Sequence, residues 1–222
     1  MGMLLSLNVG RERATEHSDV GLTGIDKRPV AGRVTVVAPG PRGTAGSTGS
    51  GVTGDLVCDH RHHGGDDQAV YAYSREELDL WQRELGRELP NGVFGENLTT
   101  LGLDTTDALI GERWQVGPQA VLEVSATRIP CNTFQGWLEE RGWVRRFTQR
   151  ALPGAYLRVI TPGGIGAGDE VTVLSRPEHG LTSGMVFRAL TLEPELLPRL
   201  LEVPELGAHQ RGFAAQRLSR NP

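Results

Sequence analysis

Residues 54–74 read GDLVCDHRHHGGDDQAVYAYS, and this stretch holds one of the 2 cysteines and three of the 6 histidines in the chain. Its last six residues, AVYAYS, predict a short strand because apolar and aromatic side chains dominate them. Ser74 and Glu77 then form the S-x-x-E pattern of a capping box. A helix is therefore predicted to begin after Ser74 and to end at Gly86.

The same stretch suggests a metal site. If residues 58–62 were extended, Cys58, His60 and His62 would share one face and present three zinc-compatible ligands. Positions four apart on a strand, however, lie roughly 13 Å apart, so a common ion would require a bend. Two other interpretations stay open: the histidines hold a turn around the pair Gly64-Gly65, or their N–H groups bind an anion beside it.

Outward from this stretch, short β-type segments alternate with glycine-rich turns. Residues 113–128 predict a strand, a tight turn and a second strand, and residues 154–177 predict a hairpin-like pair. Residues 38–55, rich in glycine, serine and threonine, predict a long mobile loop. Further elements are expected at 4–9 and 30–39 (strands) and around Phe134, Trp137 and Leu138 (a short helix). The pattern favours an antiparallel barrel or sandwich over an alternating α/β sheet.

The C-terminal part of the sequence has a helical pattern instead of a β-type pattern. Residues 182–220 contain three short helical patterns separated by prolines and by Gly207. We therefore divide the chain into a β domain, residues 1–178, and a three-helix C-terminal extension, residues 179–222.

Composition narrows the classes of function. The net charge of -4 gives no electrostatic reason to expect nucleic acid or a membrane as a partner. Lys27 is the one lysine in the sequence, so Schiff-base chemistry has a single candidate. The first apolar run is only about five residues long, too short for a signal-peptide core or a membrane span. With two cysteines predicted to be free thiols, we expect a cytoplasmic protein.

The order of five motifs identifies a family. GDLVCDHRHHGGDDQAVYAYS is followed by FGENLTT (94–100), RIPC (128–131), GAYLRV (154–159) and AGDEV (167–171). This order resembles the MOSC domain family, related to the C-terminal part of molybdenum cofactor sulfurases. The closer similarity is to stand-alone bacterial members that reduce N-hydroxylated base analogues and carry a three-helix extension. The resemblance implies a mainly β fold with helices: a MOSC-type β-barrel with peripheral helices and a small helical extension.

The resemblance also implies a molybdenum–pterin cofactor whose metal is bound by a cysteine thiolate. Cys131 in R-x-P-C matches that cysteine, and the neighbouring Arg128 favours the ionised thiol. Without the resemblance, Cys131 would be taken as a small buried hydrophobic residue. The positions implied for cofactor binding are Lys27, His62, His63, Asn97, Arg128 and Arg158, with His63 also implied in catalysis.

Each of these positions has a structural alternative. Asn97 could form a turn, Lys27 could be a solvated surface residue, and Arg128 could pair with Glu96. Arg158 could support the barrel instead of the cofactor. Cys58 matches no ligand position and is interpreted as a packing residue.

The leading functional hypothesis is a molybdenum-dependent oxidoreductase that reduces N-hydroxylated compounds, base analogues and hydroxylamines, in detoxification. No flavin, nucleotide or iron–sulfur motif is recognisable, so electrons are expected from a separate reductase of flavoprotein or ferredoxin type. A histidine could supply a proton, since imidazole titrates near neutrality. A homodimer is left open. Two rivals remain: a carrier of the cofactor or of its sulfur, and a zinc hydrolase built on Cys58, His60 and His62.

Overall fold

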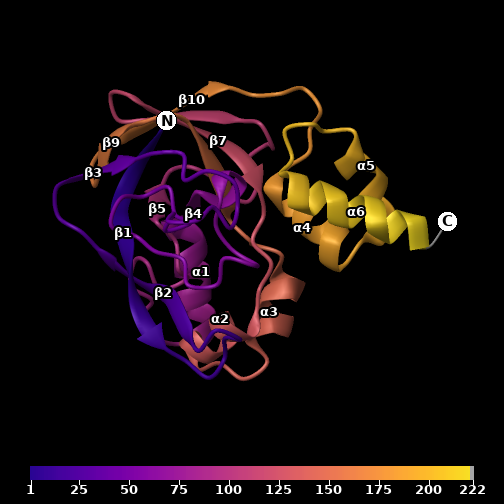
Figure 1. Ribbon diagram of the computed structural model, residues 1–222, viewed down its shortest axis with the longest axis horizontal. Coiled ribbons are helices and arrows are strands. Elements are labelled where there is room, and N and C mark those ends of the chain that lie inside the picture. The colour runs from indigo at the N-terminus through magenta and orange to yellow at the C-terminus, as the bar shows by residue number, and fades with distance from the viewer. Residues whose placement is uncertain (221–222) are drawn as a thin grey trace.

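The computed structural model describes residues 1–220, and its strands form a closed barrel with helices below and beside it (Figure 1). The strands are β1 (Gly2–Ala14), β2 (Leu22–Pro29), β3 (Arg33–Val36), β4 (Val70–Ser74), β5 (Leu98–Leu101), β6 (Arg113–Val116), β7 (Ala120–Ala126), β8 (Ala155–Thr161), β9 (Gly163–Gly166) and β10 (Glu170–Ser175). Seven of them follow the order β10-β6-β7-β8-β4-β5-β1, and β1 closes the barrel by pairing with β10. The predicted β-barrel with peripheral helices is confirmed, although β4 and β5 pair in parallel.

The register of β1 explains how its side chains reach the core. Leu4 and Leu7 are both fully buried although they lie three positions apart, which in a regular strand would put them on opposite faces. The pairing with β5 shifts between Leu4 and Ser6, which is the position of a β-bulge. A bulge inserts one extra residue and reverses the facing of the residues beyond it, so both leucines point inward.

Two strands are not evident in the sequence. β2 contains Gly24, a terminal proline and three successive charged residues, a composition that does not favour a strand. It forms because it pairs with β1 along most of its length, with Asn8 opposite Pro29. β5 lies in a segment for which no strand was predicted, and it forms between β4 and β1. Tertiary pairing thus overrides weak local propensity in both strands.

The predicted hairpin over residues 154–177 is wrong. The segment holds three strands, and β8 and β10 do not pair with each other. β8 lies between β7 and β4, whereas β10 lies between β6 and β1. The short β9 leaves the barrel to pair with β3. Barrel closure separates strands that are near each other in the sequence.

The helices lie in two groups. They are α1 (Arg75–Leu85), α2 (Asn132–Leu138), α3 (Trp143–Arg150), α4 (Ser183–Thr191), α5 (Leu197–Leu201) and α6 (Ala208–Arg220), with two 3-10 turns, η1 (Asp66–Gln68) and η2 (Pro194–Leu196). The first three lie at one end of the barrel, and the last three form the extension beside it (Figure 1). The predicted division places the extension at 179–222, of which residues 221 and 222 lie outside the described part. No helix within residues 1–220 is long and apolar enough to cross a membrane.

The start of α1 confirms the predicted cap but not the complete capping box. The Ser74 hydroxyl accepts the backbone N–H of Glu77, and Gly86 ends the helix at a φ of 66°. The Glu77 carboxylate does not return to Ser74. It accepts a hydrogen bond of 3.2 Å from the Thr105 hydroxyl instead.

The buried carboxyl of Glu77 makes stability depend on pH. Burial and the nearby carboxylates Asp104 and Asp107 raise the pKa of Glu77 to about 7, from 4.5 for the ordinary side chain. Between these values the folded chain keeps a proton that the unfolded chain has lost. The stabilising contribution is therefore complete below the unfolded value and is lost as pH rises through the folded one.

We expect Glu77→Gln to stabilise the protein more at pH 8 than at pH 5, by on the order of 2 kcal/mol. The amide stays neutral at both pH values, so it removes the cost of ionising a buried carboxyl. Urea unfolding of both proteins at both pH values measures the difference. The exposed neighbour Glu76→Gln is the control, and an equal effect of Glu77→Gln at both pH values would contradict the assignment.

Two apolar clusters fill the interior. The larger occupies the barrel and continues into the extension through residues such as Leu200, Leu206 and Ala214. The second is aromatic and joins α1, α2 and α3 to the end of the barrel. In it, Phe94 lies 5.1 Å from Phe134 and 5.4 Å from Trp143 between ring centroids. These helices thereby fix the position of the segment that carries RIPC.

Candidate functional site

A single cavity of about 490 Å³ collects most of the predicted site residues. Its walls come from β2, from residues 50–64, from the start of β4, and from residues 128–133. Lys27, His62, His63, Asn97, Arg128 and Cys131 all line it. Segments separated by up to about a hundred residues in the chain therefore meet at one site, of a volume typical of small-molecule sites.

Cys131 is the last residue of the RIPC segment and lines the cavity. It is the N-cap residue of α2, its thiol is free, and its side chain is partly exposed to the cavity. The chain reaches it from the end of β7 through Pro130. An accessible thiol, rather than a buried packing cysteine, is what a soft metal ligand requires.

Arg128 is buried against aromatic rings. Its guanidinium carbon lies 3.9 Å from the Phe134 ring centroid and 5.1 Å from that of Tyr71, and it donates a hydrogen bond to the Phe94 carbonyl. Burial opposes its charge, but the phenols of Tyr71 and Tyr156 and the thiol of Cys131 outweigh burial and raise the pKa of Arg128. The charge is thus held beside the thiol by π-stacking.

The alternative pairing of Arg128 with Glu96 is not observed. Glu96 is fully buried, and its carboxylate accepts the backbone N–H groups of Gly92 at 2.5 Å and Phe94 at 3.0 Å. It also accepts the Thr99 hydroxyl at 2.8 Å. Among residues 1–220, no carboxylate forms an ion pair with Arg128, so its charge remains available to a ligand in the cavity.

Asp55 organises the floor of the cavity. The Lys27 ammonium lies 2.6 Å from both of its carboxylate oxygens. The Asp55 carboxylate also accepts hydrogen bonds from the Ser50 hydroxyl at 2.6 Å, the Asn97 amide at 2.8 Å and the backbone N–H of Gly10 at 2.6 Å. Burial opposes ionisation, but the charge and hydrogen bonds of Lys27, with those of Ser50 and Asn97, outweigh burial and lower the pKa of Asp55.

This arrangement changes the interpretation of two predicted positions. Lys27 is not a solvated surface residue: its side chain is 10% exposed and paired with Asp55. Asn97 uses its amide nitrogen on Asp55 and on the carbonyl of Asn8, and its side-chain oxygen accepts the N–H of Tyr71. Both residues therefore build the floor of the cavity. Each can offer a ligand only those hydrogen-bond donors or acceptors that these contacts leave unused.

The histidine segment forms a turn, as one of the interpretations left open for it expected, and not the extended strand that the zinc interpretation required. The backbone N–H of His63 donates to the carbonyl of Asp59 at 3.0 Å. Gly64 and Gly65 follow with φ of 78° and 81°. A side chain at Gly64 would collide with the backbone of Gly49 at 2.6 Å, which confirms the expected need for close backbone approach.

The zinc hypothesis is not supported. Cys58 and His62 line the cavity, but the imidazole of His60 lies against Gly49. Within residues 1–220, no group of three histidine, cysteine or carboxylate side chains converges in a way that could hold a metal ion. The turn places the imidazole of His60 against Gly49 and outside the cavity that Cys58 and His62 line.

His63 does not titrate near neutrality. Burial and the positive charge of Arg128 lower the pKa of His63 to about 4. The imidazole is therefore neutral at pH 7 and offers a ligand a neutral N–H donor instead of an imidazolium proton. The expectation that this residue supplies a proton as an acid near neutrality loses its basis.

The loop predicted to be mobile is attached to the glycine pair. The N–H of Gly65 donates to the carbonyl of Gly49 at 2.9 Å, and the N–H of Asp66 donates to the carbonyl of Gly40 at 3.0 Å. Residues 40–49 therefore support the back of the histidine turn.

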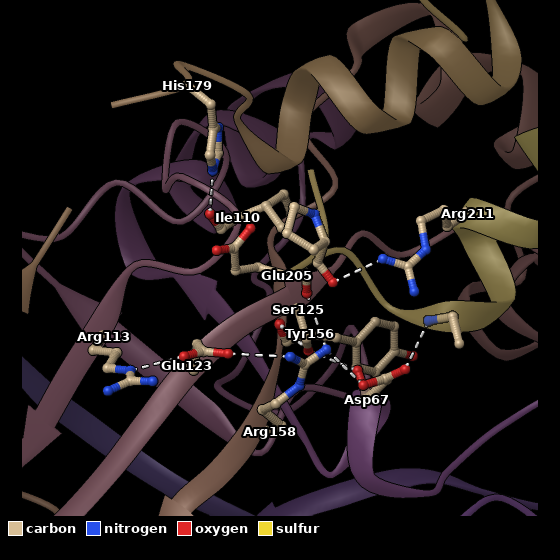
Figure 2. A network of polar contacts seen from close by, with 12 residues as sticks. Asp67, Ile110, Arg113, Glu123, Ser125, Tyr156, Arg158, His179, Glu205 and Arg211 are labelled. Atoms are coloured by element: carbon tan, nitrogen blue, oxygen red, sulfur yellow. Dashed lines mark hydrogen bonds and ion pairs between the residues drawn. The ribbon is translucent and has the colours of Figure 1, made fainter. Parts of the chain in front are cut away.

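Arg158 lies outside the cavity, contrary to the assignment of a cofactor-binding role. Its guanidinium donates to Asp67 at 2.6 Å, to Glu123 at 3.1 Å and to the carbonyl of Glu205 at 3.0 Å (Figure 2). It faces the same side of β8 as Tyr156, which lines the cavity, but it is about 7 Å farther along the strand. Its alternative role, supporting the barrel, fits these contacts.

Three of the cavity residues that were not predicted as site residues have notable surroundings. Asp55 belongs to the quoted motif, but nothing in the motif reveals its partners. Cys58, interpreted as a packing residue, lines the cavity, where burial raises the pKa of its thiol. Gln68 also lines it, and its buried side-chain oxygen has no hydrogen-bond partner among residues 1–220. Unpaired buried acceptors are costly, which marks this oxygen as a candidate acceptor for a ligand.

Comparison with known proteins agrees with this geometry. A sequence model of the MOSC domain matches residues 59–172. The uncharacterised protein YflK of Bacillus subtilis strain 168 is 33% identical over 180 residues, which cover 81% of this chain and 76% of YflK. A protein named Reductase from Gibberella moniliformis is 28% identical over 224 residues, which cover 92% of this chain but 40% of that protein.

A solved structure extends the similarity to the whole described fold. The crystal structure of YiiM from Geobacillus stearothermophilus matches with a TM-score of 0.77 and 27% identity, over 98% of this chain and 100% of that one. The matched domain spans the histidine turn, the RIPC segment and β8, each of which contributes residues to the cavity. The chain belongs to the MOSC domain family.

Proposed function

We propose that this protein holds a molybdenum–pterin cofactor in the cavity and reduces N-hydroxylated compounds. The observation that carries the proposal is the convergence of Cys131, Arg128 and the histidine turn on one cavity. Membership of the MOSC domain family and similarity to a protein named Reductase support an oxidoreductase-like role. The cofactor, the metal and the substrate class are the proposed part.

The residues of the cavity fit such a cofactor. Cys131 supplies one thiolate, and the dithiolene sulfurs of a pterin cofactor would complete a sulfur-rich set that suits molybdenum. The unpaired oxygen of Gln68 can accept an N–H from a heterocycle. Arg128 provides a positive charge that no carboxylate among the described residues neutralises. A site with one protein ligand also agrees with the lack of a three-residue metal cluster in residues 1–220.

When bound, the cofactor supplies the two-electron redox chemistry that side chains lack. Overall, an N-hydroxylated substrate, two electrons and two protons give the amine or amidine and one water. Cys131 would hold the metal, Arg128 would place its positive charge beside that sulfur, and His62 and His63 would offer N–H groups to an oxygen-bearing ligand. The Lys27–Asp55 pair keeps the floor rigid. The aromatic rings behind Arg128 exclude water from that wall.

We further propose that electrons come from a separate reductase of flavoprotein or ferredoxin type, because this sequence contains no motif for a flavin, a nucleotide or an iron–sulfur cluster. We also propose a cytoplasmic location. Both thiols are free, and the proposed chemistry requires that Cys131 remain reduced.

Turnover tests the proposal. Protein produced in a cofactor-competent host is mixed with an N-hydroxylated amidine or base and a reduced viologen dye as electron donor. We expect the dehydroxylated product to form with this protein but not with protein from a cofactor-deficient host. A cofactor-loaded protein inert towards every such compound and donor would contradict reductase function and favour the carrier of cofactor or sulfur.

A further inference from the structure

The helical extension contacts the barrel at the segment that leads to Cys131. The side-chain oxygen of Gln210, in the second position after the start of α6, accepts the backbone N–H of Thr127 at 3.1 Å. Its amide nitrogen donates to the carbonyl of the same residue at 2.7 Å. Both residues are buried. The Gln210 amide thus takes the place of a neighbouring strand just where β7 has ended.

The position of Thr127 matters because little else holds the following residues. Within residues 1–220, no hydrogen bond from another segment reaches the backbone of Ile129 or Pro130. The next fixed points are the Arg128 side chain, held on Phe94, and Cys131, whose carbonyl accepts the N–H of Gln135 in the first turn of α2. Gln210 therefore anchors the near end of the segment that presents the cysteine.

A second contact joins the same part of the extension to η1, whose Gln68 lines another part of the cavity. The carboxylate of Asp67, in η1, accepts the N–H of Ala208 at 3.0 Å and so caps α6 from outside the helix. Asp67 directly precedes Gln68, which lines the cavity, and Arg158 holds its other oxygen at 2.6 Å (Figure 2). Figure 2 shows this carboxylate between the guanidinium and the first residues of α6.

The fit between these parts is close. A side chain at Gly207 would lie 3.0–3.2 Å from the Asp67 side chain, tighter than ordinary contact. The N–H of Gly207 donates to the carbonyl of Ser125 at 2.7 Å, and the Ser125 hydroxyl donates to the carbonyl of Asp67 at 2.8 Å. Residues 205–210 thus connect the end of β7 with η1 through short hydrogen bonds, of which those between Gln210 and Thr127 are buried.

We infer that Gln210 is a positioning residue, which holds Arg128 and Cys131 in place through the backbone of Thr127, and that residues 205–210 brace the two cavity walls against each other. This inference rests on the proposed function only for the role of Cys131. Gln210 itself does not line the cavity, so its effect passes through the segment it anchors.

The reactivity of the Cys131 thiol tests the inference without any cofactor. In a Cys58→Ser background Cys131 is the one thiol, and its rate of alkylation by iodoacetamide is measured from pH 6 to pH 10. We expect Gln210→Ala to raise this rate at least threefold across this pH range, because the released segment exposes the partly buried Cys131 thiol to the reagent. Gln210→Glu keeps the acceptor for the Thr127 N–H but loses the donor, so an intermediate rate is expected. Gln210→Glu also carries the test if Gln210→Ala does not fold.

Two controls separate positioning from loss of stability. Gln216→Ala makes the same change at an exposed position of α6, and it should leave the rate at the wild-type value. Leu200→Ala removes a fully buried side chain of the extension and lowers Tm without touching the Gln210 contact. The inference is overturned if Gln210→Ala alkylates like Gln216→Ala, or if Leu200→Ala raises the rate as much at an equal loss of Tm.

The alkylation experiment can fail or succeed independently of the proposed function. A wild-type protein that takes up no molybdenum and no pterin would end the proposed function, yet the alkylation rates would still decide the role of Gln210. Conversely, a protein that binds the cofactor and shows equal rates would end the inference alone.

Discussion

Replacing Cys131 with serine is expected to abolish reduction of N-hydroxylated compounds and retention of molybdenum, with turnover lower by about two orders of magnitude or more. A serine hydroxyl is scarcely ionised at neutral pH and is a harder ligand than a thiolate, so the metal would lose its one protein ligand. The fold should persist, because the Cys131 side chain is partly exposed and makes no hydrogen bond that caps α2. Product formation with a reduced viologen donor and metal content per chain are the two measurements.

Cys58→Ser is the matched control for Cys131→Ser. It exchanges the same atoms in the same cavity, at a position that matches no ligand in the family pattern. We expect it to keep molybdenum and most of the turnover. Equal losses in both variants, or wild-type turnover in a cofactor-loaded Cys131→Ser protein, would show that Cys131 has no special role.

The second large effect concerns stability. We expect Asp55→Ala to lower the free energy of unfolding by about 3 to 5 kcal/mol, as when one partner of a buried ion pair is removed. The substitution leaves the Lys27 ammonium without its counterion and the donors of Ser50, Asn97 and Gly10 without their acceptor. Urea unfolding at pH 7 measures the loss.

Asp26→Ala is the matched control. Asp26 is a buried aspartate that pairs with Arg13 and Arg28, whose side chains are 51% and 57% exposed. Those cations keep their water when the partner is lost, so we expect a cost of only about 1 kcal/mol. Adding Lys27→Met to Asp55→Ala should recover part of the stability, since the unpaired charge is removed. Equal costs for the two aspartates, or no recovery in the double variant, would contradict this account of the floor.

The effect of Asp55 should also depend on pH. Because its folded pKa is lowered, its stabilisation is present above the unfolded value of 3.8 and is lost as pH falls through the folded value. The difference between the wild type and Asp55→Asn should therefore shrink in acid.

The sequence was informative where local pattern decides the structure. The strand at β4, the Ser74 cap, the Gly86 stop and the paired strands β6 and β7 follow from residue type and spacing over a few positions. The sequence was uninformative where pairing with distant segments decides the structure. The polar composition of β2 and the separation of β8 from β10 make sense only once the barrel has closed.

The same division applies to the site. Six predicted residues share the cavity because their motifs lie at the ends of barrel elements that meet there. Asp55 and Gln210 were not found, since each acts on a partner about forty or more residues away that no local pattern reveals. Arg158 was misassigned because strand periodicity gives the face of β8 but not how far along that face the cavity extends.

The metal and pterin content of the wild-type protein tests the central claim most directly. The protein is purified from a host that makes the molybdenum–pterin cofactor, and metals and released pterin are quantified per chain. The account predicts molybdenum and pterin in equal amounts approaching one per chain, and their loss in Cys131→Ser but not in Cys58→Ser. Wild-type protein with neither molybdenum nor pterin, or with stoichiometric zinc instead, would contradict it.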